Sequence, residues 1–190
     1  MPASPKDNQA ALLAGGTVEF VTFAARLFAD FGATVFTNGP APSDAVQLKA
    51  AGTGSGRSAC AEIYARGYAI NAMIISVLWN PALTRDSVAE EIHTVVEYLK
   101  AAQEVSGLYP RYLVLVMPQR ESILATAGGA SLRTLVGYLT RHLLAEDVRI
   151  NLCSCPISSL GAARAAEAAF TLSSGLLDEM RGQELIISDT

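Results

Sequence analysis

The sequence is short of the residues that several classes of protein need. Its three cysteines, Cys60, Cys153 and Cys155, give an odd count, which argues against a disulfide framework and favours a reducing cytoplasm. Fourteen basic residues are scattered among eighteen acids, so the net charge of -4 leaves no basic stripe for nucleic acid. The longest apolar stretch, over 69–79, is interrupted by Asn71 and is far too short to span a bilayer. Because the opening MPASPKDN is also too polar for a signal peptide, we expect a cytoplasmic protein without membrane or nucleic-acid partners.

What is present indicates one α/β domain over 1–190. An apolar content of 51% supplies one core, and no shift in composition marks a second domain. Apolar runs over 73–78 and 112–117 are typical of strands buried on both faces. They alternate with helical patterns, which predicts a Rossmann-like, doubly wound parallel sheet. Further strands are expected over 10–14, 32–36, 146–151 and 185–189, and helices over 18–31, 43–51, 57–66, 85–105 and 130–145.

Two parts of this fold are expected to be reduced. Only about thirty residues separate the second strand from the run over 73–78, so the third strand should be missing or vestigial. The glycine-rich stretch over 52–56 lacks the Lys-Ser/Thr of a phosphate loop and is interpreted as a linker. About ten residues from Cys155 to Ala165 leave little room for a lid that would exclude water from a site.

The turn over 14–21, Ala-Gly-Gly-Thr-Val-Glu-Phe-Val, joins the first strand to the first helix. A dinucleotide-binding turn at this place uses three glycines: for the bend, for the approach of the phosphates and for helix packing. Gly15 holds the first position, whereas Glu19 and Val21 hold the other two. A carboxylate here repels the anion that a helix N-terminus attracts. The sequence therefore predicts no cofactor-binding residues, and no binding of NAD or NADP by the chain alone.

These segments resemble the short-chain dehydrogenase/reductase family over most of the chain. The matches are the turn at Gly15, the segment Leu139-Thr140-Arg141, the strand that ends in Val148-Arg149-Ile150-Asn151, and Gly182-Gln183 with the apolar run after it. The resemblance implies that the third strand would flank an adenine pocket, and that its loss would weaken cofactor binding.

The family's catalytic positions are not filled. Its Tyr-x-x-x-Lys aligns with Gly129 and Arg133, its catalytic Ser with Val116, and its Asn-Asn-Ala-Gly with 75–78. None of the three lysines lies four residues after a tyrosine. Without a phenol and a neighbouring ammonium the family's acid–base step lacks its groups, so the resemblance implies a pseudoenzyme without catalytic residues. Ser122, just beyond the fifth strand, is either a ligand contact or part of a solvated loop.

Other candidate groups favour plain structural interpretations. Cys153 and Cys155 have no further metal ligands nearby in the sequence, so we expect no metal site. His93 and His142 are expected on helix surfaces or at an interface. Tyr138 and His142 have the spacing of the missing Tyr and Lys but lie about nine residues too late.

Two functions remain open from the sequence. The favoured one is a non-catalytic, structural subunit of a hetero-oligomeric short-chain dehydrogenase of the hydroxyacyl-CoA type. In such an assembly a catalytically active paralogue would bind NAD. The family contains heteromers of this kind, and 2-[hydroxy(phenyl)methyl]-succinyl-CoA dehydrogenase is one that the chain resembles. The resemblance then implies that the helices over 85–105 and 130–145 form an intersubunit bundle, where a charge at Val95 or Leu135 would disturb packing or association. It also implies that the segment over 182–190 lies at an interface. The alternative is a free-standing, Rossmann-like protein that binds a small ligand or regulates.

Overall fold

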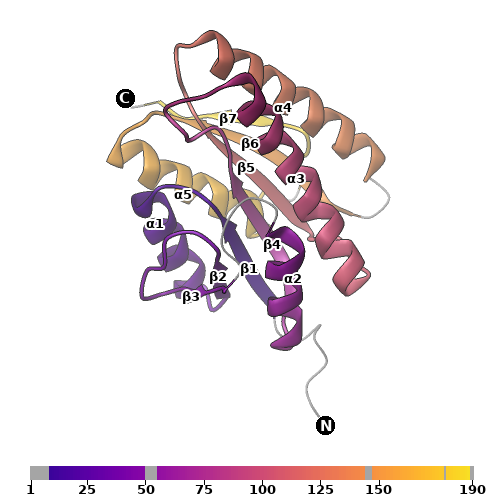
Figure 1. Cartoon of the computed structure of the whole chain (residues 1–190). Coiled ribbons are helices and arrows are strands. Elements are labelled where there is room, and N and C mark those ends of the chain that lie inside the picture. Colours follow the sequence, from indigo (N-terminus) through magenta and orange to yellow (C-terminus); the bar gives the residue numbers. More distant parts are fainter. Residues whose placement is uncertain (1–8, 50–54, 144–146, 178, 189–190) are drawn as a thin grey trace.

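A seven-stranded parallel sheet forms the centre of the molecule (Figure 1). The computed structural model describes residues 9–49, 55–143, 147–177 and 179–188. Across the sheet the strands follow the order β3-β2-β1-β4-β5-β6-β7, and every neighbouring pair is parallel. The predicted Rossmann-like sheet is thereby confirmed. The strands are β1 (Gln9–Ala14), β2 (Thr34–Thr37), β3 (Val46–Gln47), β4 (Ala69–Ser76), β5 (Tyr112–Pro118), β6 (Arg149–Cys155) and β7 (Glu184–Ile186).

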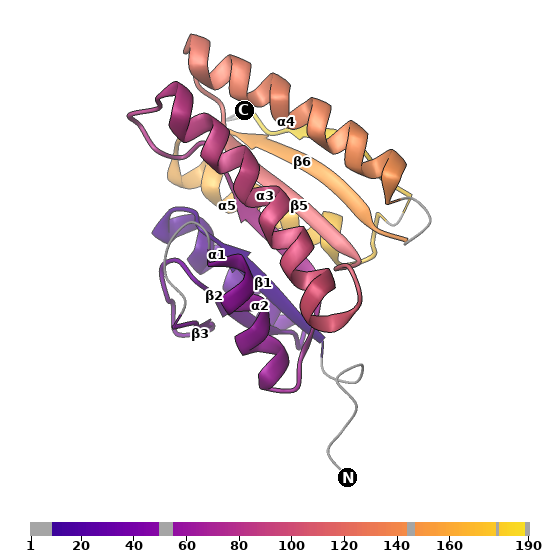
Figure 2. The ribbon, with the colours of Figure 1, turned by 45° about the vertical axis from the view of Figure 1, so that its right-hand side comes forward.

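Helices cover both faces of the sheet (Figure 2). One face carries α1 (Val18–Asp30) and α5 (Ser159–Ser173), and the other carries α2 (Gly56–Ala65), α3 (Arg85–Ser106) and α4 (Ile123–His142). The central strands supply side chains to both layers in alternation, because successive residues of a strand point to opposite faces. In β5, Leu113 and Leu115 pack with α3 and α4, whereas Val114 and Val116 pack with α1 and α5. Within the described residues, no helix combines the length and the apolar character that crossing a membrane requires.

The third strand is vestigial, as predicted, but the helix expected over 43–51 is wrong. The two residues of β3 pair with Phe36 and Thr37 of β2. Before them the chain makes a turn, in which the Ala45 N–H donates to the Pro42 carbonyl at 3.1 Å. Buried Leu48 then donates its N–H to the Thr37 carbonyl at 2.8 Å, so pairing with the sheet prevails over local helix propensity. Residues 50–54, with most of the predicted linker, lie outside the described residues.

Helix α4 begins at Ile123 and not at residue 130 as the sequence pattern predicted. Ser122 caps it, since its hydroxyl accepts a hydrogen bond from the Ala125 N–H at 3.1 Å. The early turns contain Gly128, whose lack of a side chain allows the helix to approach Leu78, in the loop after β4. A Cβ there would lie 2.9 Å from a methyl carbon of Leu78. Ser122 is therefore a helix cap, which accounts for its hydroxyl without a ligand.

The connection between β6 and α5 is even shorter than the roughly ten residues that the sequence predicted. Only residues 156–158 separate the two elements, and Ser158 caps α5 by accepting from the Gly161 N–H at 2.9 Å. No lid can form within so short a connection.

Candidate functional site

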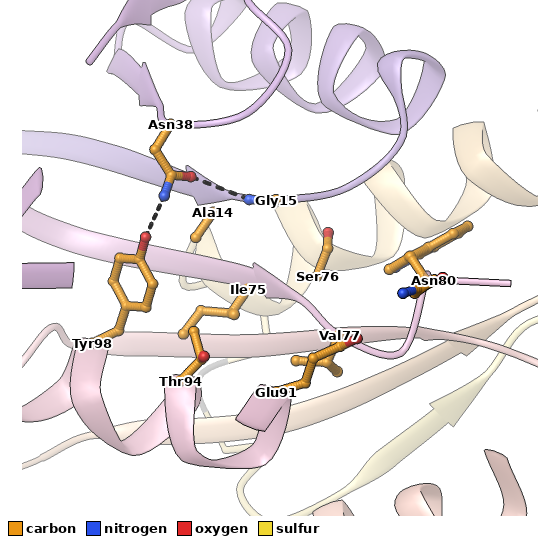
Figure 3. Close-up of a pocket in the computed structure, with 11 residues that line it drawn as sticks. Ala14, Gly15, Asn38, Ile75, Ser76, Val77, Asn80, Glu91, Thr94 and Tyr98 are labelled. Atoms are coloured by element: carbon orange, nitrogen blue, oxygen red, sulfur yellow. Dashed lines mark hydrogen bonds between the residues drawn. The ribbon is translucent and has the colours of Figure 1, made fainter. Parts of the chain in front are cut away.

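A pocket lies where the strand order of the sheet reverses. From β1 the chain continues to β2 on one side, and β4 pairs with β1 on the other, with Ala14 opposite Ile75 at their carboxyl ends. Ligands of open α/β sheets bind in the crevice at such a switch point. Here the crevice is a cavity of about 320 Å³. Its lining residues, most of them shown in Figure 3, are Ala14, Gly15, Asn38, Ile75, Ser76, Val77, Trp79, Asn80, Glu91, Thr94 and Tyr98.

The glycine turn after β1 packs tightly against the end of β4. Gly16 has a φ of +103°, and a Cβ on it would lie 2.8 Å from the Ser76 hydroxyl oxygen. That hydroxyl is buried and has no hydrogen-bond partner among the described residues. Val21 is buried beneath the turn, where a Gly16 Cβ would lie 3.3 Å from one of its methyl carbons. Glu19 is exposed and does not line the cavity, so its carboxylate does not point into the site as the sequence interpretation supposed.

Asn38, immediately after β2, closes one end of the pocket. Its side-chain oxygen accepts from the Gly15 N–H at 3.2 Å, and its amide donates to the Tyr98 hydroxyl (Figure 3). The amide also donates to the Ser55 hydroxyl at 3.1 Å. Burial raises the pKa of Tyr98, although the hydroxyl of Ser55 and the amide of Asn38 partly oppose the rise. Sequence reasoning missed this network, because its members lie 17 to 60 residues apart. The only local signal was an Asn-Gly pair directly after the second strand.

The loop between β4 and α3 forms the other end of the pocket and is held under strain. Leu78 has a φ of +61°, which costs a residue with a side chain about 1–2 kcal/mol. Its N–H donates to the Glu91 carboxylate of α3. The Arg120 guanidinium donates to the carbonyls of Trp79 and Asn80, each at 2.7 Å. Strained backbone conformations that the surrounding structure holds in place tend to occur at functional sites.

Glu91 is the only carboxyl group among the lining residues. Burial raises its pKa, and the Leu78 N–H and the positive charge of Arg120 oppose that rise. A half-buried carboxyl group with a raised pKa in a cleft is a candidate for binding or proton transfer. Sequence reasoning did not single it out, because Glu91 lies within an ordinary helical pattern.

The positions of the family's catalytic pair are structural. Gly129 packs on Met117, whose terminal methyl would lie 3.3 Å from a Cβ placed on the glycine. Arg133 forms two hydrogen bonds to Glu184 of β7, at 2.6 and 2.9 Å. Val116 is fully buried on the other face of the sheet, the one that α1 and α5 cover. None of these three residues lines the switch-point pocket.

The Arg133–Glu184 pair predicts a pH-dependent contribution to stability. The hydrogen bonds that Arg133 donates to Glu184 hold the pKa of this carboxyl group below its usual value. Such a carboxylate stabilises the fold fully above its unfolded pKa, about 4.3, and the contribution is lost as the pH falls through the lower folded pKa. In urea denaturation at pH 7 we expect Glu184→Gln to lower the free energy of unfolding by about 0.5–1 kcal/mol. The difference from the parent protein should shrink between pH 5 and pH 3; a difference that stays constant would show that Glu184 acts through packing.

The remaining sequence candidates do not form a site. Burial raises the pKa of the Cys60 thiol to about 12 and also raises that of Cys153, so both thiols stay protonated. No group of three possible metal ligands occurs in the described part of the chain. His93 is exposed on α3, and its Nε2 atom lies 3.5 Å from a carboxylate oxygen of Glu97. Tyr138 packs against His142 at the surface of α4, with the two ring centres 4.0 Å apart.

Comparison with known proteins gives relatives by structure alone. No protein-family model and no curated protein sequence matches the chain. A short-chain dehydrogenase/reductase from Brucella ovis, in complex with a partially ordered NAD, is 15% identical with a TM-score of 0.72; the match covers 95% of this chain and 100% of that one. The enoyl-[acyl-carrier-protein] reductase (NADH) from Aquifex aeolicus VF5 is 14% identical with a TM-score of 0.73, over 94% of both chains. A 3-ketoacyl-ACP reductase from Sinorhizobium meliloti 1021 is 16% identical with a TM-score of 0.69, over 94% of this chain and 96% of that one.

These similarities correct the expectation that the chain is not an enzyme. The three relatives are an oxidoreductase and two reductases, and they share nearly the whole length of the chain. Nothing in these comparisons supports a non-catalytic role for the chain. The prediction of a pseudoenzyme, which rested on the missing catalytic motifs of the family, is therefore wrong. At 14–16% identity the similarity establishes the fold, which is that of the short-chain dehydrogenase/reductase oxidoreductases.

Proposed function

We propose that the chain is an oxidoreductase-class protein that binds a nucleoside-containing cofactor or substrate in the switch-point pocket. The observation that carries this proposal is the position of the pocket between the carboxyl ends of β1 and β4, where this type of sheet binds its ligands. Two of the structural relatives are named for NAD or NADH. The polar ends of the pocket and its apolar middle also have the composition of a small-molecule site.

Calorimetric titration of the purified full chain with adenosine, ADP and NAD tests this function. We expect heat of binding from at least one of the three, and its loss in Thr94→Phe, which fills the pocket from α3. The matched control is Thr134→Phe on the exposed surface of α4, which should bind like the parent protein. If none of the three compounds binds, or if Thr94→Phe binds as the parent does, the proposal is overturned.

A second candidate function concerns assembly with a catalytically active short-chain dehydrogenase paralogue of the hydroxyacyl-CoA type. The observation that favours it is the outer face of α4, where Ile123 is 89% and Tyr138 57% exposed and small residues such as Ala127 and Ala130 lie between them. At the sheet edge, Ile186 of β7 is 68% exposed, and an edge strand of this kind is a ready site for pairing. Such an assembly would place this chain beside a subunit that binds NAD.

Co-expression with a paralogous short-chain dehydrogenase from the same host, followed by native mass spectrometry, tests the assembly. We expect a complex of the two chains that Ala130→Asp dissociates without unfolding either one. A monomer in every preparation would contradict this second candidate and leave the pocket proposal intact.

A further inference from the structure

The described residues that line the pocket carry no positive charge to receive a phosphate. They include no lysine and no arginine, and their one acidic side chain is that of Glu91. Arg120 lies nearby, but its guanidinium nitrogens donate to the backbone carbonyls of Trp79 and Asn80. The charge of Glu91 therefore disfavours an anion at the place where the fold would hold a pyrophosphate.

Two backbone N–H groups at the glycine turn and the start of α1 donate within the protein. The Gly15 N–H donates to the Asn38 side chain at 3.2 Å, and the Phe20 N–H donates to the Thr17 hydroxyl at 3.2 Å. In an anion site at a helix N-terminus, backbone N–H groups of this kind point at the ligand. A phosphate at the turn would have to displace the Asn38 oxygen, and with it the contact between Asn38 and the buried Tyr98 hydroxyl.

The pocket offers one hydrogen-bond acceptor and one hydrogen-bond donor, with apolar side chains around them. One carboxylate oxygen of Glu91 accepts from Leu78, and no described residue donates to the other. The Asn80 side-chain oxygen accepts from the Ala82 N–H at 2.9 Å, and no described residue accepts from its amide nitrogen. Ile75, Val77 and the indole of Trp79 supply apolar surface around them.

We infer that the pocket selects a compact ligand without phosphate groups, a nucleoside whose hydroxyl or amino hydrogens meet Glu91, and that it discriminates against the phosphorylated forms. This inference rests on the proposed function and specifies the ligand for the same site. A cavity of about 320 Å³ is at the small end of the range for ligand pockets, about 300–1,000 Å³, which agrees with a ligand of this size. The charge of Glu91 and the Asn38 bond to Gly15 are then selectivity elements, since both oppose a phosphate.

The test compares the affinities of adenosine, ADP and NAD for the full-length parent protein and two variants by calorimetry. In the parent protein we expect adenosine to bind at least about tenfold more tightly than ADP or NAD. Glu91→Gln keeps an acceptor for the Leu78 N–H but removes the charge, so adenosine should bind more weakly and the ratio of adenosine to ADP affinity should fall at least about threefold. Glu90→Gln, one residue earlier on the exposed side of α3, should leave both affinities unchanged.

The outcomes separate this inference from the proposed function. If ADP or NAD binds as tightly as adenosine, the inference is overturned and the pocket proposal stands. If Glu91→Gln has the affinities of the parent protein, the assignment to Glu91 is overturned. If no compound binds to any variant, the proposed function itself fails.

Discussion

Val95→Asp is expected to destabilise the chain strongly. Val95 is fully buried on α3, within the core between that helix and the sheet. It belongs to a core cluster of hydrophobic residues, and an unpaired buried charge costs about 3–5 kcal/mol. A natural domain of this size has a total stability of about 5–15 kcal/mol, so the loss is a large part of the whole. Urea denaturation followed by circular dichroism measures it.

The control is Ala130→Asp, which places the same carboxylate on the exposed surface of α4. It should cost no more than about 0.7 kcal/mol, the difference in helix propensity. The sequence interpretation allowed a charge at Val95 to act on association; the buried position assigns its effect to folding. Equal denaturation midpoints for Val95→Asp and Ala130→Asp would contradict the packing of α3 described here.

Gly161→Ala is expected to destabilise the connection between β6 and α5. A Cβ at this position would lie 2.3 Å from the Pro156 carbonyl oxygen and 3.0 Å from its carbon. Because these are backbone atoms in a connection of three residues, they cannot move aside without shifting the start of α5. Overpacking of this kind costs about 1–3 kcal/mol.

Gly137→Ala is the matched substitution, and it is expected to stabilise the protein. In α4 a Cβ on Gly137 would have only an Arg141 nitrogen within reach, at 4.0 Å. Replacing a helical glycine with alanine then gains about 1 kcal/mol of helix propensity. Thermal unfolding should therefore show a lower midpoint for Gly161→Ala and an equal or higher one for Gly137→Ala. A normal midpoint for Gly161→Ala would show that the first turn of α5 is looser than its contacts indicate.

The sequence predicted the sheet well because the central strands carry their own signal. The runs that became β4 and β5 are apolar at nearly every position, which is what burial under helices on both faces requires. Prediction failed where tertiary contacts decide. Residues 46–47 join the sheet by pairing with Phe36 and Thr37 of β2. Gly128 lies within α4, where the close approach of Leu78 leaves no room for a side chain.

The candidate site was less accessible to sequence reasoning. Asn38 follows β2, whereas Glu91 and Tyr98 lie on α3, and only the folded chain brings the three residues to one pocket. The sequence interpretation compared the chain with one known set of catalytic residues, found Gly129 and Arg133 in their places, and concluded that no chemistry remained. That comparison could not reveal groups that lie outside the known set.

Amide chemical shifts in the presence of adenosine test the central claim most directly. In a spectrum of the ¹⁵N-labelled full chain, binding in the switch-point pocket should move the signals of Gly15, of the Asn38 and Asn80 side-chain amides and of the Trp79 indole N–H. A second cavity of about 200 Å³ at the opposite end of β1, lined by Phe28, Phe31 and Phe170 among others, provides the internal comparison. The account predicts shifts that cluster around the first cavity and leave residues such as Asn71 and Ser173 of the second unchanged. Shifts that cluster around the second cavity, or none at saturating adenosine, would contradict it.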